Sequence, residues 1–255
     1  MEKQTRLNQS VQKTLQIIET MAQAREPLRL ADLAQQVHMP ASTTLRMVNT
    51  LVERHYAYQD PVTLRYALTL RFAQIGAMVS DRFSIRDTAH PFLVELSNRC
   101  GESCCLAVEE DMEVIYLDVV DGPDGMLKIT QRIGKRAPMH STGVGKLLLT
   151  QYTPQQLQAL IDSKGLVRLT QRTKATPEEL EVELAAIRAR GYAFDDEECE
   201  LGARCVAAPI RDYADKIVAA ISISGPVSRM TPQQAEAFAP LLLQTAQRIE
   251  RLLAH

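Results

Sequence analysis

The chain has 255 residues, of which 45% are hydrophobic and 24% are charged, and its formal net charge is −2. This composition is typical of a soluble globular protein, and the length is enough for two ordinary domains. The sequence has no apolar run of about 18 residues or more that could span a bilayer. Its first thirty residues also lack the continuous apolar core of a secretion signal. These features predict a cytoplasmic protein without a membrane partner.

Charge is divided unevenly along the chain. The first eighty residues carry nine Lys and Arg against six Asp and Glu, whereas the remainder carries twenty against twenty-five. A modestly basic N-terminal part joined to an acidic remainder is compatible with a nucleic-acid-binding module attached to a second domain.

The cysteine content argues against both a disulfide framework and a metal site. Five cysteines are an odd number for a chain of this length, so reduced thiols are expected. The usual Cys-x2-Cys pairs and Cys/His sets of zinc sites are absent. We therefore predict no metal and no cofactor, and interpret the cysteines as small buried apolar residues. They are Cys100, Cys104, Cys105, Cys199 and Cys205.

Three helical patterns follow one another in the N-terminal part. Apolar residues recur at steps of three and four over residues 11–21, 30–37 and 41–54. Ser10 is predicted to cap the first helix, and Pro40 to occupy the first helical position of the third. The positions of the first helix expected to face the core are Val11, Leu15, Ile18 and Met21.

The third predicted helix has an apolar face, from Leu45 and Val48 to Leu51 and Val52, which is expected to pack on the first two helices. Its other face carries short hydroxyls, Arg and Asn. A helix in the major groove uses these side chains to contact phosphates, thymine, guanine and adenine. The residues predicted to contact DNA are Ser42, Thr43, Thr44, Arg46 and Asn49, with Arg65 from the following segment.

A hairpin is predicted after the third helix. Residues 56–68 alternate apolar and polar on either side of a turn at Asp60-Pro61. A short helix, a tight turn, a polar-faced helix and a hairpin in this order favour a winged helix-turn-helix over residues 1–70. The alternative is an ordinary small helical domain with a solvated polar face.

The rest of the chain predicts a linker and an α+β domain. A helical pattern over residues 69–79 is interpreted as a linker helix within residues 71–87. Strand-type runs grouped around helices then predict an α+β domain over residues 88–255. The expected strands are 103–110, 113–120, 125–133, 203–210 and 217–224, and the expected helices are 88–100, 141–150, 154–163, 177–190 and from Pro232 to the end.

The stretch MHSTGVGKLLL, residues 139–149, looks like the end of a nucleotide-binding phosphate loop. Such a loop needs a glycine five positions before its Gly-Lys and a Ser or Thr directly after it. His140 and Leu147 stand at those positions, so we reject nucleotide binding. What remains is a helix start capped by Ser or Thr, whose free amides could hold an anion.

Taken together, the sequence resembles the isocitrate lyase regulator (IclR) family of bacterial transcription factors along almost its whole length. The matching motifs are PASTTLRMVNTLVE, GKRAPMHSTGVGKLLL, GYAFDDEECELGARCVAAPIRD and AAISISGP. The resemblance implies an N-terminal winged helix-turn-helix, a linker helix and a C-terminal effector-binding domain related to the GAF fold, with an antiparallel sheet. It also implies homodimers, often homotetramers.

The resemblance further implies an effector site. Backbone amides of Gly143 and Val144 would meet a small organic acid, while Asp195 would meet a hydroxyl or hydrated carbonyl, because a carboxylate beside an anion is repelled or must take up a proton. Ala137 and Ala203 are smaller than in some relatives, so a ligand larger than a two-carbon acid is expected. The complete predicted set is Met126, Ile129, Ala137, Gly143, Val144, Asp195, Ala203, Cys205, Ser222 and Ser224.

These observations predict a DNA-binding transcriptional regulator whose binding to a double-stranded operator is controlled by a small organic acid, with no catalytic residues. The first alternative is a thiol or redox sensor or a GAF-type enzyme, because Cys104 and Cys105 lie on a predicted strand. The second is an interaction module that has lost DNA binding. Without the resemblance, the acidic run 195–198 would be interpreted as a solvated turn, and Ser222 and Ser224 as ordinary strand residues.

Overall fold

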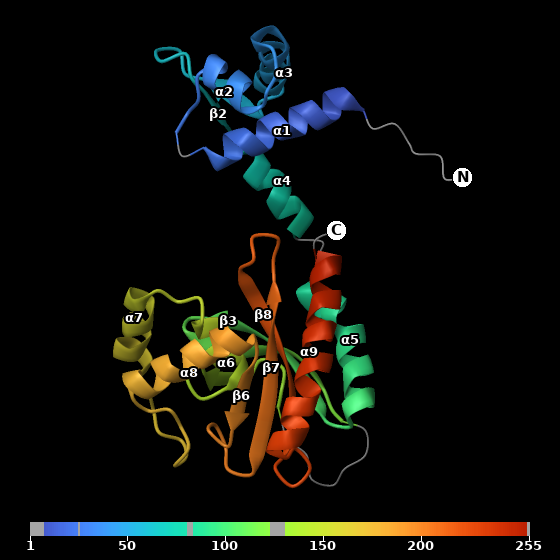
Figure 1. The fold of residues 1–255 in the computed structure, drawn as a ribbon, viewed down its shortest axis with the longest axis vertical. Helices are drawn as coiled ribbons and strands as arrows, with labels where there is room; N and C mark the ends of the chain where they lie inside the picture. The colour runs from blue at the N-terminus through green and yellow to red at the C-terminus, as the bar shows by residue number, and fades with distance from the viewer. Residues whose placement is uncertain (1–7, 25, 81–83, 123–130, 254–255) are drawn as a thin grey trace, which may run out of the picture. The chain divides into compact units, whose positions relative to one another are not determined.

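The computed structural model describes residues 8–24, 26–80, 84–122 and 131–253. The chain divides into two compact units, Met1–Arg82 and Phe83–His255, and each is described by itself (Figure 1). Within the described parts of the chain, no helix is long and apolar enough to cross a membrane.

The first unit has the predicted order of elements. Three helices precede a two-stranded hairpin, and a fourth helix follows it. The first three helices share a single hydrophobic core. Each contributes a fully buried side chain to it: Ile17, Leu33 and Val48. The elements are α1 (Gln9–Gln23), α2 (Leu30–Gln36), α3 (Ala41–Glu53), β1 (Ala57–Gln59), β2 (Tyr66–Leu68) and α4 (Arg71–Ser80).

The first helix differs from the prediction in its cap and its buried face. Asn8, not Ser10, caps α1, because its side-chain oxygen accepts hydrogen bonds from two amides of the first turn. Ile17 is buried, whereas Val11 and Leu15 are 54% and 51% exposed. Both faces of this helix carry apolar residues, so periodicity alone could not choose between them. The choice is made by α2 and α3, which pack on the Ile17 side.

The buried face of α3 is also rotated relative to the prediction. Met47 and Thr44 are buried together with Val48, whereas Leu45 is only half-buried. Pro40 stands just before the helix, at the cap position, instead of at the first helical position. The polar face is therefore narrower than the sequence pattern indicated.

The hairpin that follows is antiparallel, and its register pairs Ala57 with Leu68 and Gln59 with Tyr66. Asp60 forms the turn, since its carboxylate accepts hydrogen bonds from the amides of Val62 and Thr63. The wing predicted for a winged helix-turn-helix is present.

The second unit is built on one six-stranded antiparallel sheet with the order β5-β4-β3-β8-β7-β6. Two of its strands, β5 and β6, were not predicted because they have only three and four residues. The predicted strand 125–133 falls mostly outside the described residues, and its part at 131–133 is not a strand. The strands are β3 (Ser103–Glu110), β4 (Glu113–Val120), β5 (Arg136–Pro138), β6 (Ala193–Asp196), β7 (Ala203–Arg211) and β8 (Ile217–Pro226).

Helices cover both faces of this sheet (Figure 1). Along β3, Cys105 and Ala107 face the α6 side, and Cys104 and Leu106 face α5 and α9. Burial on both faces explains why the central strands are apolar almost without interruption. The helices are α5 (Ile85–Cys100), α6 (Gly143–Leu149), α7 (Pro154–Lys164), α8 (Pro177–Arg190) and α9 (Pro232–Leu253).

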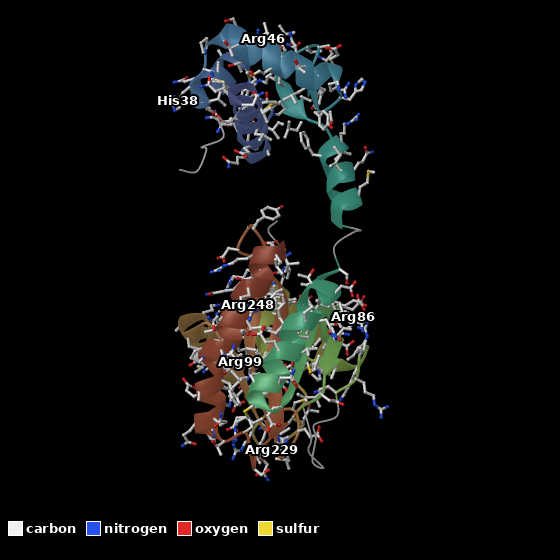
Figure 2. The ribbon with its side chains drawn as sticks, turned by 90° about the vertical axis from the view of Figure 1, so that its right-hand side faces the viewer. His38, Arg46, Arg86, Arg99, Arg229 and Arg248 are labelled. Carbon is white, nitrogen blue, oxygen red and sulfur yellow. The ribbon has the colours of Figure 1, made fainter. Side chains whose placement is uncertain are left out.

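Two features shape the α5 side of the sheet. Arg248 of α9 donates two hydrogen bonds to Glu95 of α5, at 2.8 and 2.9 Å, which joins the two helices (Figure 2). The second feature is a bulge in β4, after which its side chains point to the opposite faces of the sheet from those that regular alternation would give. Tyr116 faces the α6 side of the sheet, whereas Asp118 contacts His90 on α5.

Candidate ligand cavity and nucleic-acid interface

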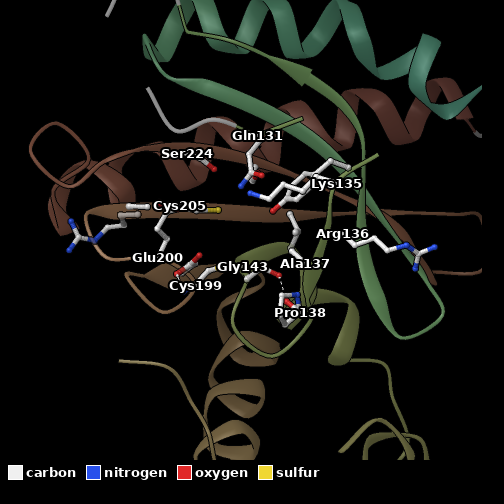
Figure 3. Close-up of a pocket in the computed structure, with 17 residues that line it drawn as sticks. Gln131, Lys135, Arg136, Ala137, Pro138, Gly143, Cys199, Glu200, Cys205 and Ser224 are labelled. Atoms are coloured by element: carbon white, nitrogen blue, oxygen red, sulfur yellow. Dashed lines mark hydrogen bonds between the residues drawn. The ribbon is translucent and has the colours of Figure 1, made fainter. Parts of the chain in front are cut away.

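A cavity of about 140 Å³ opens where the start of α6 meets strands β4 to β8 (Figure 3). Eight of the ten predicted effector residues line it: Ala137, Gly143, Val144, Asp195, Ala203, Cys205, Ser222 and Ser224. The other two, Met126 and Ile129, lie outside the described residues.

The floor of the cavity is a row of polar side chains across three strands. Asp195 on β6 is paired with Cys205 on β7, and Cys205 is paired with Ser224 on β8. Side chains of directly paired residues lie on the same face of a sheet. Ser222 lies two residues from Ser224 on β8 and therefore lines the same face.

The start of α6 forms the opposite wall. The hydroxyl of Thr142 accepts a hydrogen bond from the amide of Gly145 and donates one to the carbonyl of Pro138. Among the described residues, none accepts a hydrogen bond from the amides of Gly143 and Val144. Those two amides are therefore free to bind a ligand.

Space requires a glycine at position 145 of this wall and leaves little room for a side chain at position 143. A Cβ on Gly145 would collide with the backbone of Met139. A Cβ on Gly143 would lie 3.3 Å from both the Ala207 Cβ and the Cys205 Sγ. Glycine thus lets the first turn of α6 approach the strand floor, and it places the free amides directly above the polar row.

Asp195 is the most perturbed acid of the cavity. Its side chain is buried, and the residue is 8% exposed. Burial raises the pKa of Asp195 to about 7, although hydrogen bonds from the amides of Cys199 and Glu198 act in the opposite direction. Both amides donate to Oδ1, at 3.2 and 2.8 Å, and no described residue donates to Oδ2. One carboxylate oxygen therefore orders the following loop, while the other is open.

The acidic run 195–198 is not a solvated turn. Glu198 is buried and accepts a hydrogen bond from the ammonium group of Lys146 at 2.5 Å, and Lys146 is 0% exposed. Burial raises the pKa of Glu198, while Lys146 lowers it. Lys146, the lysine of the Gly-Val-Gly-Lys motif, therefore forms a buried ion pair with Glu198. This ion pair positions the loop after β6, whose amides donate to Asp195.

Several lining residues were missed by the sequence analysis, among them Gln131, Lys135, Arg136 and Arg204. Arg136 forms ion pairs with acidic residues of β3 and β4, and Arg204 with Asp196. Lys135 has no ion-pair partner among the described residues. Figure 3 shows Gln131 and Lys135 extending into the cavity, whereas Arg136 extends away from it. Lys135 lies in a loop, where no periodic pattern could have identified it.

The cysteines around the cavity are protonated thiols. Burial raises the pKa of Cys205 to about 12 and the pKa of Cys199 to about 11, and it also raises the pKa of Cys105. A buried thiol of this kind is a poor nucleophile. Within the described residues, no group of three or more His, Cys, Asp or Glu side chains is arranged to hold a metal ion.

The candidate DNA-contacting residues of α3 are only partly accessible. Ser42, Arg46 and Asn49 are exposed, and Thr43 is half-buried. Thr44 is 0% exposed, and its hydroxyl donates to the carbonyl of Pro40. The assignment of Thr44 to DNA was therefore wrong, because its side chain faces the core. Figure 2 labels Arg46 on this helix and His38 at the exposed turn before it.

The hairpin offers little free positive charge to DNA. Arg65 donates a hydrogen bond to the carbonyl of Pro27 at 3.3 Å and lies 4.0 Å from Glu26. Its guanidinium is therefore partly engaged within the domain. The tip itself exposes Val62 and Leu64, which carry no charge.

Comparison with known proteins agrees with this architecture. Residues 10–61 match the IclR helix-turn-helix domain, and residues 77–251 match the bacterial transcriptional regulator IclR C-terminal domain. The chain is 34% identical over 243 residues to the transcriptional repressor IclR of Escherichia coli, covering 94% of this chain and 88% of that protein. It is 31% identical to the E. coli regulator XynR, covering 97% of this chain and 98% of that protein.

Solved structures show the same likeness. The Thermotoga maritima IclR structure matches with a TM-score of 0.64 and 30% identity, over 96% of this chain and 99% of that one. An IclR homologue from Microbacterium hydrocarbonoxydans, complexed with 4-hydroxybenzoate, matches with a TM-score of 0.59 and 25% identity, over 96% of this chain and 98% of that one. The chain belongs to the IclR family and is a DNA-binding transcriptional regulator.

Proposed function

We propose that a small organic acid binds in the cavity of the second unit and changes the affinity of the protein for its operator. The observation that carries the proposal is the position of two free amides, those of Gly143 and Val144, directly above the polar row of β6, β7 and β8. A ligand placed between these walls would be held by donors on one side and by polar side chains on the other.

The chemistry of the walls favours an acid. A carboxylate accepts hydrogen bonds and carries negative charge, so it matches the two amides and the ammonium group of Lys135, which forms no ion pair with any residue that the structure describes. The small side chains of Ala137 and Ala203 leave room in the lining for more than a two-carbon chain. The homologue complexed with 4-hydroxybenzoate supports this ligand class, since that protein shares the fold.

On the DNA side, we propose that Ser42, Thr43, Arg46 and Asn49 read the major groove, and that Arg65 contacts the backbone beside it. Thr44 instead anchors the start of α3 in the core. A single helix of this kind contacts only a few base pairs, so we propose a homodimer, or a dimer of dimers, on half-sites roughly 34 Å apart. Such a protein acts in the cytoplasm, where the chromosome is, and needs no enzymatic activity.

The proposal is tested by measuring operator affinity with and without acids. Fluorescence anisotropy with duplex DNA from upstream of its own coding sequence gives the affinity, and added acid is expected to change it. Replacing both Ser222 and Ser224 by Ala should weaken the response to acid and leave acid-free operator binding intact. Ser228→Ala, on an exposed turn, is the control. An unaltered response in the double variant would refute the assigned floor of the cavity.

One observation favours a thiol sensor as a second candidate. The Sγ atoms of Cys100 and Cys104 are 3.8 Å apart, and the hydrogen bond between them lowers the pKa of Cys100. A thiol with a lowered pKa and a neighbouring thiol can form a disulfide under oxidation. If Cys100→Ser leaves operator binding equally sensitive or insensitive to hydrogen peroxide, this second function is refuted.

A further inference from the structure

Both ends of α2 carry residues that are unfavourable at those positions. Arg29 stands at the N-cap position, where an acceptor side chain is preferred, and it makes no capping hydrogen bond. Its positive charge also lies at the end of the helix whose dipole disfavours cations. At the other end, His38 has a φ of 52°, in the left-handed region that favours glycine. A Ser at position 29 and a Gly at position 38 would each make the first unit more stable.

Neither side chain makes a contact within the protein that would offset this loss of stability. Both are exposed, and no residue that the structure describes accepts a hydrogen bond from the side chain of Arg29 or His38 or forms an ion pair with it. Figure 2 shows His38 at the outer end of the unit, at the turn before α3. Residues that break local rules in this way are expected at functional sites. Both side chains can donate hydrogen bonds, and a guanidinium matches a phosphate.

The place of α2 in its motif indicates where phosphates would lie. When a recognition helix occupies the major groove, the helix before it crosses the phosphate backbone. α2 has seven residues and is about 10 Å long, whereas the phosphates of one strand follow one another every ~3.4 Å along the duplex axis. Leu28, directly before Arg29, pairs antiparallel with Tyr66, directly after Arg65. Arg29 is therefore next to the hairpin residue that we place on the backbone.

We propose that Arg29 and His38 bind backbone phosphates at the two ends of α2, and that the first unit is less stable than it could be because it keeps them. This inference rests on the proposed placement of α3 in the major groove and adds two residues to the interface. Because the phosphates are alike at every base pair, these contacts position α3 on the duplex without selecting a sequence.

The same two residue types stand at the far end of α3 and supply a matched control. Arg54 is the C-cap of that helix, and His55, which follows it, has a φ of 62°; both are exposed. The test variant combines Arg29→Ser with His38→Gly, and the control variant combines Arg54→Ser with His55→Gly. Each variant loses one arginine and one left-handed histidine, so the two have the same net charge.

Fluorescence anisotropy on the full chain measures binding to the operator and to a scrambled duplex at several salt concentrations, and calorimetry measures the melting temperature. The test variant should melt roughly 4 °C or more above the wild type, because it gains a cap and loses a left-handed histidine. It should nevertheless bind both duplexes roughly tenfold more weakly, with the slope of log K against log salt reduced by about one. The control variant should keep the wild-type affinity and slope.

Greater stability together with weaker binding distinguishes a DNA contact from a structural role, since loss of a structural residue would lower the melting temperature. The inference is overturned if the test variant is no more stable than the wild type, or if it binds both duplexes as the wild type does. It is also overturned if the loss is confined to the operator, or if the control variant loses as much affinity.

Arg46→Ala, measured in the same assay, separates this inference from the proposed function. If Arg46→Ala loses operator affinity while the test variant keeps it, only the contacts of Arg29 and His38 are refuted. If Arg46→Ala binds the operator normally, the placement of α3 in the major groove is refuted, and the inference falls with it.

Discussion

The two units differ in where they place their polar side chains, which are exposed in the first unit and buried in the second. The first unit presents its polar side chains on the outside of one helix, where Arg46 and Asn49 are exposed and cost little to keep. The second unit buries its polar groups, with Asp195 at 8% and Lys146 at 0% exposure, in a sheet covered on both faces. Burying a polar or charged group is unfavourable unless it is paired. Substitutions in the second unit should therefore affect stability, and those in the first should affect binding.

The largest expected effect tests the buried ion pair. Lys146→Met leaves the carboxylate of Glu198 buried without its cation, which should lower the free energy of unfolding by roughly 3–5 kcal/mol. Urea denaturation of the variant measures it. The control is Lys164→Met, because Lys164 lies 3.3 Å from Glu113 in a half-exposed pair that should contribute about 1 kcal/mol or less. Both lysines lie in the second unit, so equal losses in the two variants would contradict the claim that burial is what makes the Lys146–Glu198 pair costly to break.

The second effect is the pH dependence that burial of Asp195 creates. Because its pKa is raised to about 7 from an ordinary value of 3.8, the folded state holds this proton more tightly than the unfolded state. Stability should therefore be highest below the ordinary value and fall as the pH rises towards 7, by roughly 3–4 kcal/mol.

Asp195→Asn cannot ionise and should lack this part of the decrease. The free energies of unfolding of both proteins at pH 5 and pH 8 give the comparison. The free energy of unfolding of the variant, relative to that of the wild type, should be higher at pH 8 than at pH 5. Glu198, whose pKa burial also raises, is present in both proteins and cancels. Parallel curves for the two proteins would mean that Asp195 is not the buried acid described above.

The third effect belongs to the first unit. Arg46→Ala should weaken binding to the operator by roughly 1–3 kcal/mol and reduce discrimination against other sequences, with the melting temperature almost unchanged. Arg54→Ala, an exposed residue at the other end of α3, is the control. If the Arg46→Ala protein is destabilised instead, or binds the operator normally, the exposed face of α3 does not contact the bases of the operator.

The smallest effect sharpens the comparison within the first unit. Arg65→Ala should weaken binding to all duplexes alike, by about 1 kcal/mol or less, and reduce the salt dependence of binding by up to about one ion. The effect is small because Arg65 is partly engaged with Pro27 and Glu26. A loss confined to one operator sequence would show that Arg65 reads a base and does not contact only the backbone.

The sequence alone determined the helices and the longer strands, with most of their boundaries, but it missed the short strands β5 and β6. Helices such as α7 and α8 can be predicted from a Thr cap followed by Pro and from regular apolar spacing, because these are local properties of the chain. The motif resemblance likewise brought ten residues from distant segments into one predicted site, and the eight of them that the structure describes all line one cavity.

Only the tertiary structure decided which faces are buried and which polar groups are paired. Asp195 looks like part of a solvated acidic run until β6 is placed beside β7, and Lys146 looks like a phosphate ligand until Glu198 meets it. Thr44 faces the core for the same reason: its exposure is set by the elements that pack on α3. Burial and pairing depend on contacts between segments far apart in the chain, and local propensity carries no information about them.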